Sequence, residues 1–141
     1  MEDTPSSRKV AAAPALVIES DFFMAGEIRA VFEDLGLPFS VVPGVDRAQS
    51  VVTEGVFSIA VLSAKCVSDL GVRIAAQLRE RNERIPLILL CPHDRLDRLT
   101  DAGPFSSALF IPPPIRTSEL RRRVMEALGL ADTDQSGTTI S

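Results

Sequence analysis

Short apolar runs alternate with amphipathic segments along almost the whole of this 141-residue chain. Each apolar run is shorter than a typical helix, whereas the segments between the runs carry apolar residues at helical spacing. Strands that are apolar throughout are typical of a parallel sheet with both faces covered by helices. The alternation therefore predicts βαβ units within a single α/β domain.

The apolar runs that we expect to form strands are residues 15–18, 38–42, 57–62, 85–90 and 108–111. The expected helices are residues 22–35, 46–54, 70–81, 94–101 and 117–128, of which 46–54 has the weakest pattern. Gly36 follows the first helix in the position of a left-handed end residue, residues 63–69 form a loop, and Thr117 is the expected N-cap of the last helix. This order fits a (βα)5 flavodoxin-like, doubly wound three-layer sandwich, with parallel strands in the order 2-1-3-4-5.

The ends of the chain differ from this pattern. Residues 1–13 and 130–141 are mostly small or polar and aperiodic, so we expect flexible tails around a domain at 14–129. No apolar stretch approaches the roughly 20 residues of a membrane span, and residues 10–13 are too short for a signal-peptide core. We expect a cytoplasmic protein with no membrane partner.

The net charge and the cysteines weigh against three further classes of protein: nucleic-acid-binding, disulfide-rich and zinc-binding proteins. A net charge of −4 weighs against nucleic acid as the main partner. Cys66 and Cys91 are expected to be buried, reduced thiols. With one histidine in the chain and no ligand-like spacing, a zinc site is not expected.

Function in a doubly wound sheet lies at the carboxyl ends of the central strands. In this sequence those ends carry Glu19, Ser20 and Asp21 after the first strand, Ser63 after the third, and Cys91 after the fourth. Residues 112–114, three prolines, follow the fifth strand. These positions are the candidate functional site.

Residues 14–129 resemble a response-regulator receiver domain of two-component signalling. Residues 16–21 (Leu-Val-Ile-Glu-Ser-Asp) resemble the family's first strand, which ends in two acids that hold Mg²⁺. Residues 85–91 (Ile-Pro-Leu-Ile-Leu-Leu-Cys) resemble its fourth strand, which ends in threonine or serine. Residues 110–120, with Phe-Ile-Pro-Pro-Pro-Ile and then Glu-Leu, resemble the fifth strand and its Lys-Pro turn. The resemblance implies a bacterial signalling role and a cis bond before Pro114.

Four of the family's five functional positions are altered. The second acid is Ser20, the phospho-acceptor aspartate is Ser63, the hydroxyl residue is Cys91, and the lysine is Pro113. A serine cannot form an acyl phosphate, and without the lysine nothing cationic compensates transferred phosphate charge. Mg²⁺ prefers several oxygen ligands, commonly with carboxylates among them, and Glu19 is the only matched one that remains. We therefore expect no phosphorylation of Ser63, no catalytic residue, no metal and no cofactor.

The remaining residues of this pocket have simpler structural interpretations. Glu19 and Asp21 form a remnant acidic pair, with Glu19 hydrogen-bonded to loop amides or solvent and Asp21 pointing elsewhere. Phe110 occupies the family's switch-aromatic position and is expected to be static and buried, because Cys91 is a weak hydrogen-bond donor. Residues 112–114 form a rigid turn, and Asp69 marks a helix start.

Arg121, Arg122 and Arg123 are the candidate protein interface. A solvated charged face is the simpler interpretation, although arginine suits interface ion pairs. The resemblance implies a homodimer or partner docking on the face formed by the fourth helix, fifth strand and fifth helix. The partner would be a sensor kinase, a phosphotransfer protein or another receiver.

Three functions remain open at this stage. The first is a stand-alone degenerate receiver, or pseudo-receiver, which acts as a phosphorylation-independent adaptor in a phosphorelay. The second is a module that binds a nucleotide or flavin phosphate; it is disfavoured because residues 19–23 carry two carboxylates and bulky side chains where a phosphate needs converging amides. The third is an enzyme with Cys66 or Cys91 as nucleophile, and neither has a matched base.

Overall fold

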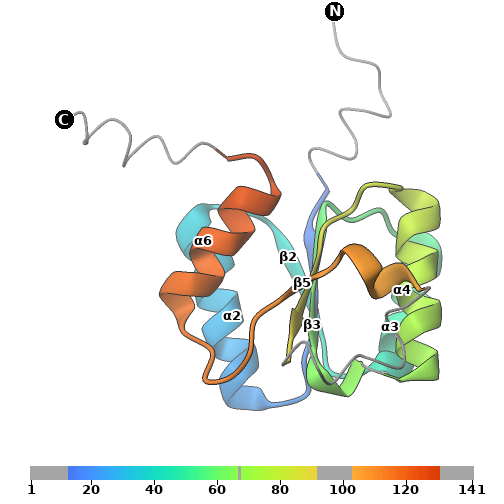
Figure 1. Cartoon of the computed structure of the whole chain (residues 1–141), viewed down its shortest axis with the longest axis horizontal. Coiled ribbons are helices and arrows are strands. Elements are labelled where there is room, and N and C mark those ends of the chain that lie inside the picture. Colours follow the sequence, from blue (N-terminus) through green and yellow to red (C-terminus); the bar gives the residue numbers. More distant parts are fainter. Residues whose placement is uncertain (1–12, 67, 92–102, 131–141) are drawn as a thin grey trace, which may run out of the picture.

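The protein forms five parallel strands between two layers of helices (Figure 1). The computed structural model describes residues 13–66, 68–91 and 103–130. The strands are β1 (Ala15–Ile18), β2 (Phe39–Val42), β3 (Ile59–Ser63), β4 (Leu87–Leu90) and β5 (Leu109–Phe110). Their order in the sheet is β2-β1-β3-β4-β5, and every neighbouring pair is parallel. The predicted fold class and strand order are therefore confirmed.

Four α-helices are present in the described residues: α2 (Phe22–Leu35), α3 (Val45–Glu54), α4 (Asp69–Arg81) and α6 (Thr117–Ala127). Two short 3-10 helices accompany them, η1 (Ala64–Cys66) and η3 (Pro104–Ser107). Figure 1 shows α2 and α6 on one face of the sheet and α3 and α4 on the other. The predicted helix 94–101 lies outside the described residues, as do most of the two predicted tails. No helix of the described residues is both long and apolar enough to cross a membrane.

Alternate residues of each central strand enter different hydrophobic clusters, because successive side chains of a strand point to opposite faces. Val17, Val61 and Ile88 pack with residues of α2 and α6. Leu62 and Leu89 pack with residues of α3 and α4. Both faces of the sheet are thus covered, which explains why the strand sequences are apolar throughout.

Local capping signals set the ends of α2. Asp21 precedes the helix in an extended conformation, and its Oδ1 accepts a hydrogen bond from the Met24 amide at 2.9 Å. Gly36 ends the helix with φ of 70°, in the left-handed region that glycine adopts without strain. Gly36 was predicted as this end residue, whereas the capping role of Asp21 was not; the predicted bounds of the helix are confirmed.

The start of α6 differs from the prediction. Arg116 holds the extended N-cap position, and Thr117 is already the first helical residue, so its hydroxyl is one position too late to cap the helix. The cap makes no side-chain hydrogen bond. The prediction of Thr117 as N-cap was therefore wrong.

Except for β1, the strands are shorter than predicted because their partners limit them. β3 was predicted to begin at residue 57. It begins at Ile59, which is the first residue of β3 that pairs with β1. β4 begins after Pro86, whose nitrogen has no hydrogen to donate to the ladder. Within the predicted loop 63–69, Ser63 still belongs to β3 and Ala64–Cys66 form η1.

One guanidinium group connects α4 to the segment that leads into β5. Arg79 Nε donates to the Pro104 carbonyl at 3.2 Å, and Arg79 Nη2 donates to Ser107 Oγ at 3.0 Å. β5 itself pairs with β4 through two residues only, Leu109 and Phe110. Side-chain contacts from α4 thus contribute to the position of this short edge strand.

Candidate functional site

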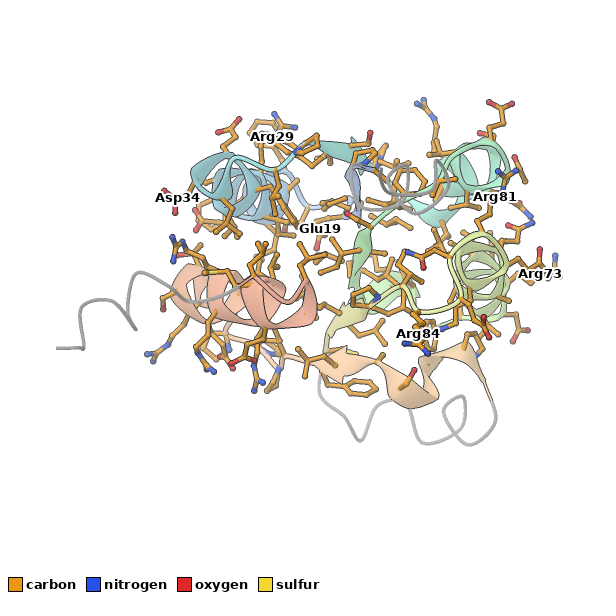
Figure 2. All side chains as sticks on the ribbon, turned by 90° about the horizontal axis from the view of Figure 1, so that it is seen from above. Glu19, Arg29, Asp34, Arg73, Arg81 and Arg84 are labelled. Atoms are coloured by element: carbon orange, nitrogen blue, oxygen red, sulfur yellow. The ribbon has the colours of Figure 1, made fainter. Side chains whose placement is uncertain are left out.

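Three predicted site residues lie together at the carboxyl edge of the sheet. β3 pairs with β1 on one side and β4 on the other, with Ile18 opposite Leu62 and Ser63 opposite Leu90. Glu19, Ser63 and Cys91 therefore stand at the ends of three adjacent strands, and all three are buried. Figure 2 shows Glu19 in the central layer, between the two layers of helices.

The Glu19 carboxylate is turned back onto its own loop. Its Oε2 accepts a hydrogen bond from the Asp21 amide at 2.9 Å, and its backbone amide donates to the Val42 carbonyl at 3.0 Å. Asp21 caps α2 through Met24 and is exposed. Glu19 is thus bonded to a loop amide, as expected, and Asp21 points elsewhere, as expected, with the start of α2 as its partner.

Ser63 is buried beside the sulfur of Cys66. The Ser63 Oγ and Cys66 Sγ atoms are 3.9 Å apart, and either can be the donor. η1 makes this contact possible, because its single turn brings Cys66 back over the strand end. The Ser63 hydroxyl thus lies in a packed environment with a thiol as its neighbour.

Burial raises the pKa of the Cys66 thiol to about 11, although the contact with Ser63 acts in the opposite direction. The nearby Glu19 and Cys91 add smaller upward effects. Reactive cysteines have a depressed pKa and partial exposure, whereas Cys66 is buried and protonated at neutral pH. Cys91 is also buried, and neither residue is in a disulfide. The environment of Cys66 therefore disfavours a role as nucleophile.

A lysine that no sequence motif marks lies at the same edge. Lys65, in η1, donates from Nζ to Ser20 Oγ at 3.1 Å, and both residues are exposed. This contact joins Lys65 to Ser20 and not to Ser63, so the prediction that nothing cationic compensates transferred phosphate charge stays a prediction. One feature of the sequence could have suggested the contact. Lys65 comes two residues after the end of β3, at the carboxyl edge of the sheet.

Other predicted site residues lie near the surface. Pro112, Pro113 and Pro114 are exposed, and the bond between Pro113 and Pro114 is cis, as the resemblance implied. Phe110 packs against the cluster on the α3 and α4 side but is half-buried rather than fully buried as predicted. The difference arises because β5 is the edge strand, with a sheet neighbour on one side only.

The three arginines of α6 are engaged in ion pairs. Arg121 Nε lies 2.7 Å from Asp34 Oδ2 of α2. Arg122 pairs with Glu126 at 3.4 Å, and Arg123 lies within 3.8 Å of Glu119 and within 3.5 Å of Glu126. Arg122 is exposed, whereas Arg121 and Arg123 are half-buried. Arg122 is thus the most accessible of the three.

The residues at this edge do not fit the Mg²⁺ site that the resemblance implies. The Glu19 carboxylate is hydrogen-bonded to its own loop, Ser20 contacts Lys65, and Ser63 supplies a neutral hydroxyl. Within the described ranges, no group of three histidine, cysteine or acidic residues is placed to hold a metal ion. The phosphate-binding alternative is also disfavoured, because the Asp21 carboxylate occupies the N-terminus of α2 where a phosphate would bind.

The comparisons agree on the fold. No protein-family model matches the chain, and no curated protein sequence matches it. Solved structures do match, and their common fold is that of response-regulator receiver domains.

A response regulator receiver protein from Sinorhizobium medicae superposes with a TM-score of 0.69 and 16% identity, over 83% of this chain and 94% of that one. The receiver domain of Francisella response regulator 1452 gives a TM-score of 0.64 and 22% identity, over 83% and 97%. The receiver domain of a Pseudomonas aeruginosa sensor histidine kinase, solved with magnesium in its active site cleft, gives 0.63 and 16%, over 83% and 98%. At these identities the similarity establishes the receiver fold.

Proposed function

We propose that this protein is a degenerate receiver domain that acts in the bacterial cytoplasm as an adaptor of two-component signalling, without phosphorylation or catalytic activity of its own. The observation that carries the proposal is the environment of the Ser63 hydroxyl, which has no base beside it among the contacts described for it. Its hydroxyl is buried at the end of β3 and in contact with a protonated thiol. A hydroxyl becomes a useful acceptor only when a base activates it, and Cys66 is not a base at neutral pH.

The proposed partner is a protein of the same signalling system: a sensor kinase, a phosphotransfer protein, another receiver or a second copy of this chain. Two surface features support protein binding. Arg122 is exposed beside two half-buried arginines of α6, and arginine is enriched in protein interfaces. Phe22 and Phe23, at the start of α2, are 93% and 72% exposed. Large apolar side chains this exposed are common at binding surfaces.

The first experiment tests the chemistry. Mg²⁺ and beryllofluoride, a phosphoryl mimic, are titrated into the wild-type protein while amide NMR shifts are followed at Glu19, Ser63 and Cys91. We expect no saturable shift at millimolar metal. A receiver domain with an intact acceptor aspartate serves as the positive control, and a saturable response of this protein at the three positions would overturn the proposal.

The second experiment tests the adaptor role. Binding is measured against purified sensor-kinase transmitter, phosphotransfer and receiver domains of the same organism, and self-association is measured by sedimentation. We expect Arg122→Glu to weaken the strongest of these interactions about tenfold, whereas Arg73→Glu, on the outer side of α4 (Figure 2), leaves it unchanged. An absence of both binding and self-association would contradict the adaptor role.

A further inference from the structure

The contact between Lys65 and Ser20 joins two loops that are far apart in the chain. Ser20 lies in the loop after β1, and Lys65 lies in η1, directly after β3. Their side chains meet at 3.1 Å across a separation of 45 residues. Because β1 and β3 are neighbours in the sheet, this one hydrogen bond spans the edge at which the candidate site lies.

The surroundings of Ser20 are acidic. Glu19 precedes it and is buried, and Asp21 follows it and is exposed. A lysine ammonium is a compact charge with three donors, so it can contribute positive charge to this edge while bonding to a hydroxyl. In a receiver with intact chemistry, the position of Ser20 holds an acid that binds a divalent cation.

η1 explains why Lys65 can reach this place. A 3-10 helix has about three residues per turn, so adjacent residues of η1 face in different directions. Cys66 is buried against Ser63, while Lys65 remains exposed and extends across the edge toward Ser20. The same turn therefore packs the acceptor-equivalent residue and supplies the cation.

We propose that Lys65 takes the place of the divalent cation in this degenerate site. Its ammonium group ties the loop after β1 to the turn after β3 and disfavours a second cation by like-charge repulsion. This inference rests on the proposed function, because it takes Ser20 as the equivalent of a metal-binding acid. It goes further in assigning to one residue the role of holding the edge in a single arrangement without metal.

The test restores the acid and then removes the lysine. Ser20→Asp is made alone and combined with Lys65→Ala, and Mn²⁺ is added while the broadening of amide NMR signals at residues 19–21 and 63 is followed. Position 20 is exposed, so the added acid is compatible with folding. We expect the Mn²⁺ midpoint of Ser20→Asp/Lys65→Ala to be about tenfold lower than that of Ser20→Asp.

A matched control removes a different charge. Ser20→Asp/Arg73→Ala loses one positive charge from the outer side of α4, and its midpoint should stay within about twofold of that of Ser20→Asp. The proposal is wrong if Lys65→Ala lowers the midpoint no more than Arg73→Ala does, including the case in which no variant binds Mn²⁺.

A second measurement examines the tie between the loops in the otherwise native protein. Lys65→Ala should accelerate amide hydrogen exchange of Ser20 and Asp21, whereas Arg73→Ala should leave it unchanged. Unchanged exchange in Lys65→Ala would contradict the tie. These outcomes are separate from those of the proposed function, which fails only if the wild-type protein responds to beryllofluoride or binds no protein.

Discussion

No side chain fits at Gly71, because a Cβ atom there would lie 1.7 Å from the carbonyl oxygen of Cys66. η1 is pressed against the first turn of α4 at this point. Ser68 completes the junction: its amide donates to the Cys66 carbonyl at 2.9 Å, and its Oγ accepts from the Gly71 amide at 3.1 Å. The turn that carries Lys65 and Cys66 is thus held in place by a residue without a side chain.

Gly71→Ala should therefore destabilise the protein by about 1–3 kcal/mol, the usual cost of forcing extra volume into packed structure. Alanine is the better helix former, so its propensity acts against this loss. Gly26→Ala is the matched control, because its Cβ would meet nothing within 4 Å. That variant should gain about 0.5–1 kcal/mol. Urea unfolding measures both, and equal effects of the two substitutions would contradict the close contact.

Stability should fall in alkaline solution because of Cys66. Burial raises the pKa of this thiol from 9.0 to about 11 in the folded protein. Its contribution to stability is fully present below pH 9; above that pH the unfolded thiol ionises first, so the contribution is lost as the pH approaches 11. The loss should be about 2–3 kcal/mol across this window.

Urea unfolding of wild type and Cys66→Ala at pH 8, 9, 10 and 11 measures this effect as a difference, so that other titrating groups cancel. The free energy of unfolding should decline more steeply for the wild type. Cys91→Ala keeps Cys66 and should retain most of the slope. If the free energy of unfolding of wild type and of Cys66→Ala changes with pH in parallel, the pKa of the Cys66 thiol is not raised in the folded protein.

The ion pair between Arg121 and Asp34 connects α6 to α2 but should stabilise the fold only slightly. Both side chains are substantially exposed, at 42% and 63%. A double-mutant cycle with Arg121→Ala and Asp34→Ala should give a coupling energy of about 0.2–1 kcal/mol that decreases with added salt. A coupling energy well above this range, or one that salt leaves unchanged, would indicate that the ion pair is shielded from solvent more than the exposed fractions of Arg121 and Asp34 imply.

Arg79→Gln should loosen the segment that leads into β5. The substitution removes hydrogen bonds from the guanidinium to Pro104 and Ser107, which together should cost about 1–3 kcal/mol. Amide exchange should accelerate at Ala108 and Ile111, which flank the strand. Arg73→Gln, at an exposed position of the same helix, is the control. If amide exchange at Ala108 and Ile111 is the same in Arg79→Gln and Arg73→Gln, β5 is held in place by other contacts.

Much of the fold could be predicted from local sequence, because local interactions produce it. β1 and α2 have the predicted bounds, since the apolar run of β1, the helical spacing of α2 and the left-handed Gly36 are all local signals. The ends of the other strands depend on pairing with distant partners. β5 shows this most clearly: four residues were expected, and two are paired.

The candidate site was predictable only in part. Glu19, Ser63 and Cys91 lie where strand ends were expected, so their meeting at one edge follows from the strand order. The contacts of Ser63 with Cys66 and of Ser20 with Lys65 depend on η1, a single turn without periodicity of its own. Its geometry is set by packing against Gly71, which no local pattern describes.

The sheet divides the interior into two separate hydrophobic clusters. Cys66, which contacts Ser63, and Cys91, at the end of the next strand, belong to the cluster on the α3 and α4 side. Leu120 and Val124, which seat α6 with its arginines, belong to the other. Mutational drift in one compartment therefore need not disturb packing in the other. Substitutions that change the chemistry at the end of β3, on one side of this partition, can thus leave the seat of α6 on the opposite side intact.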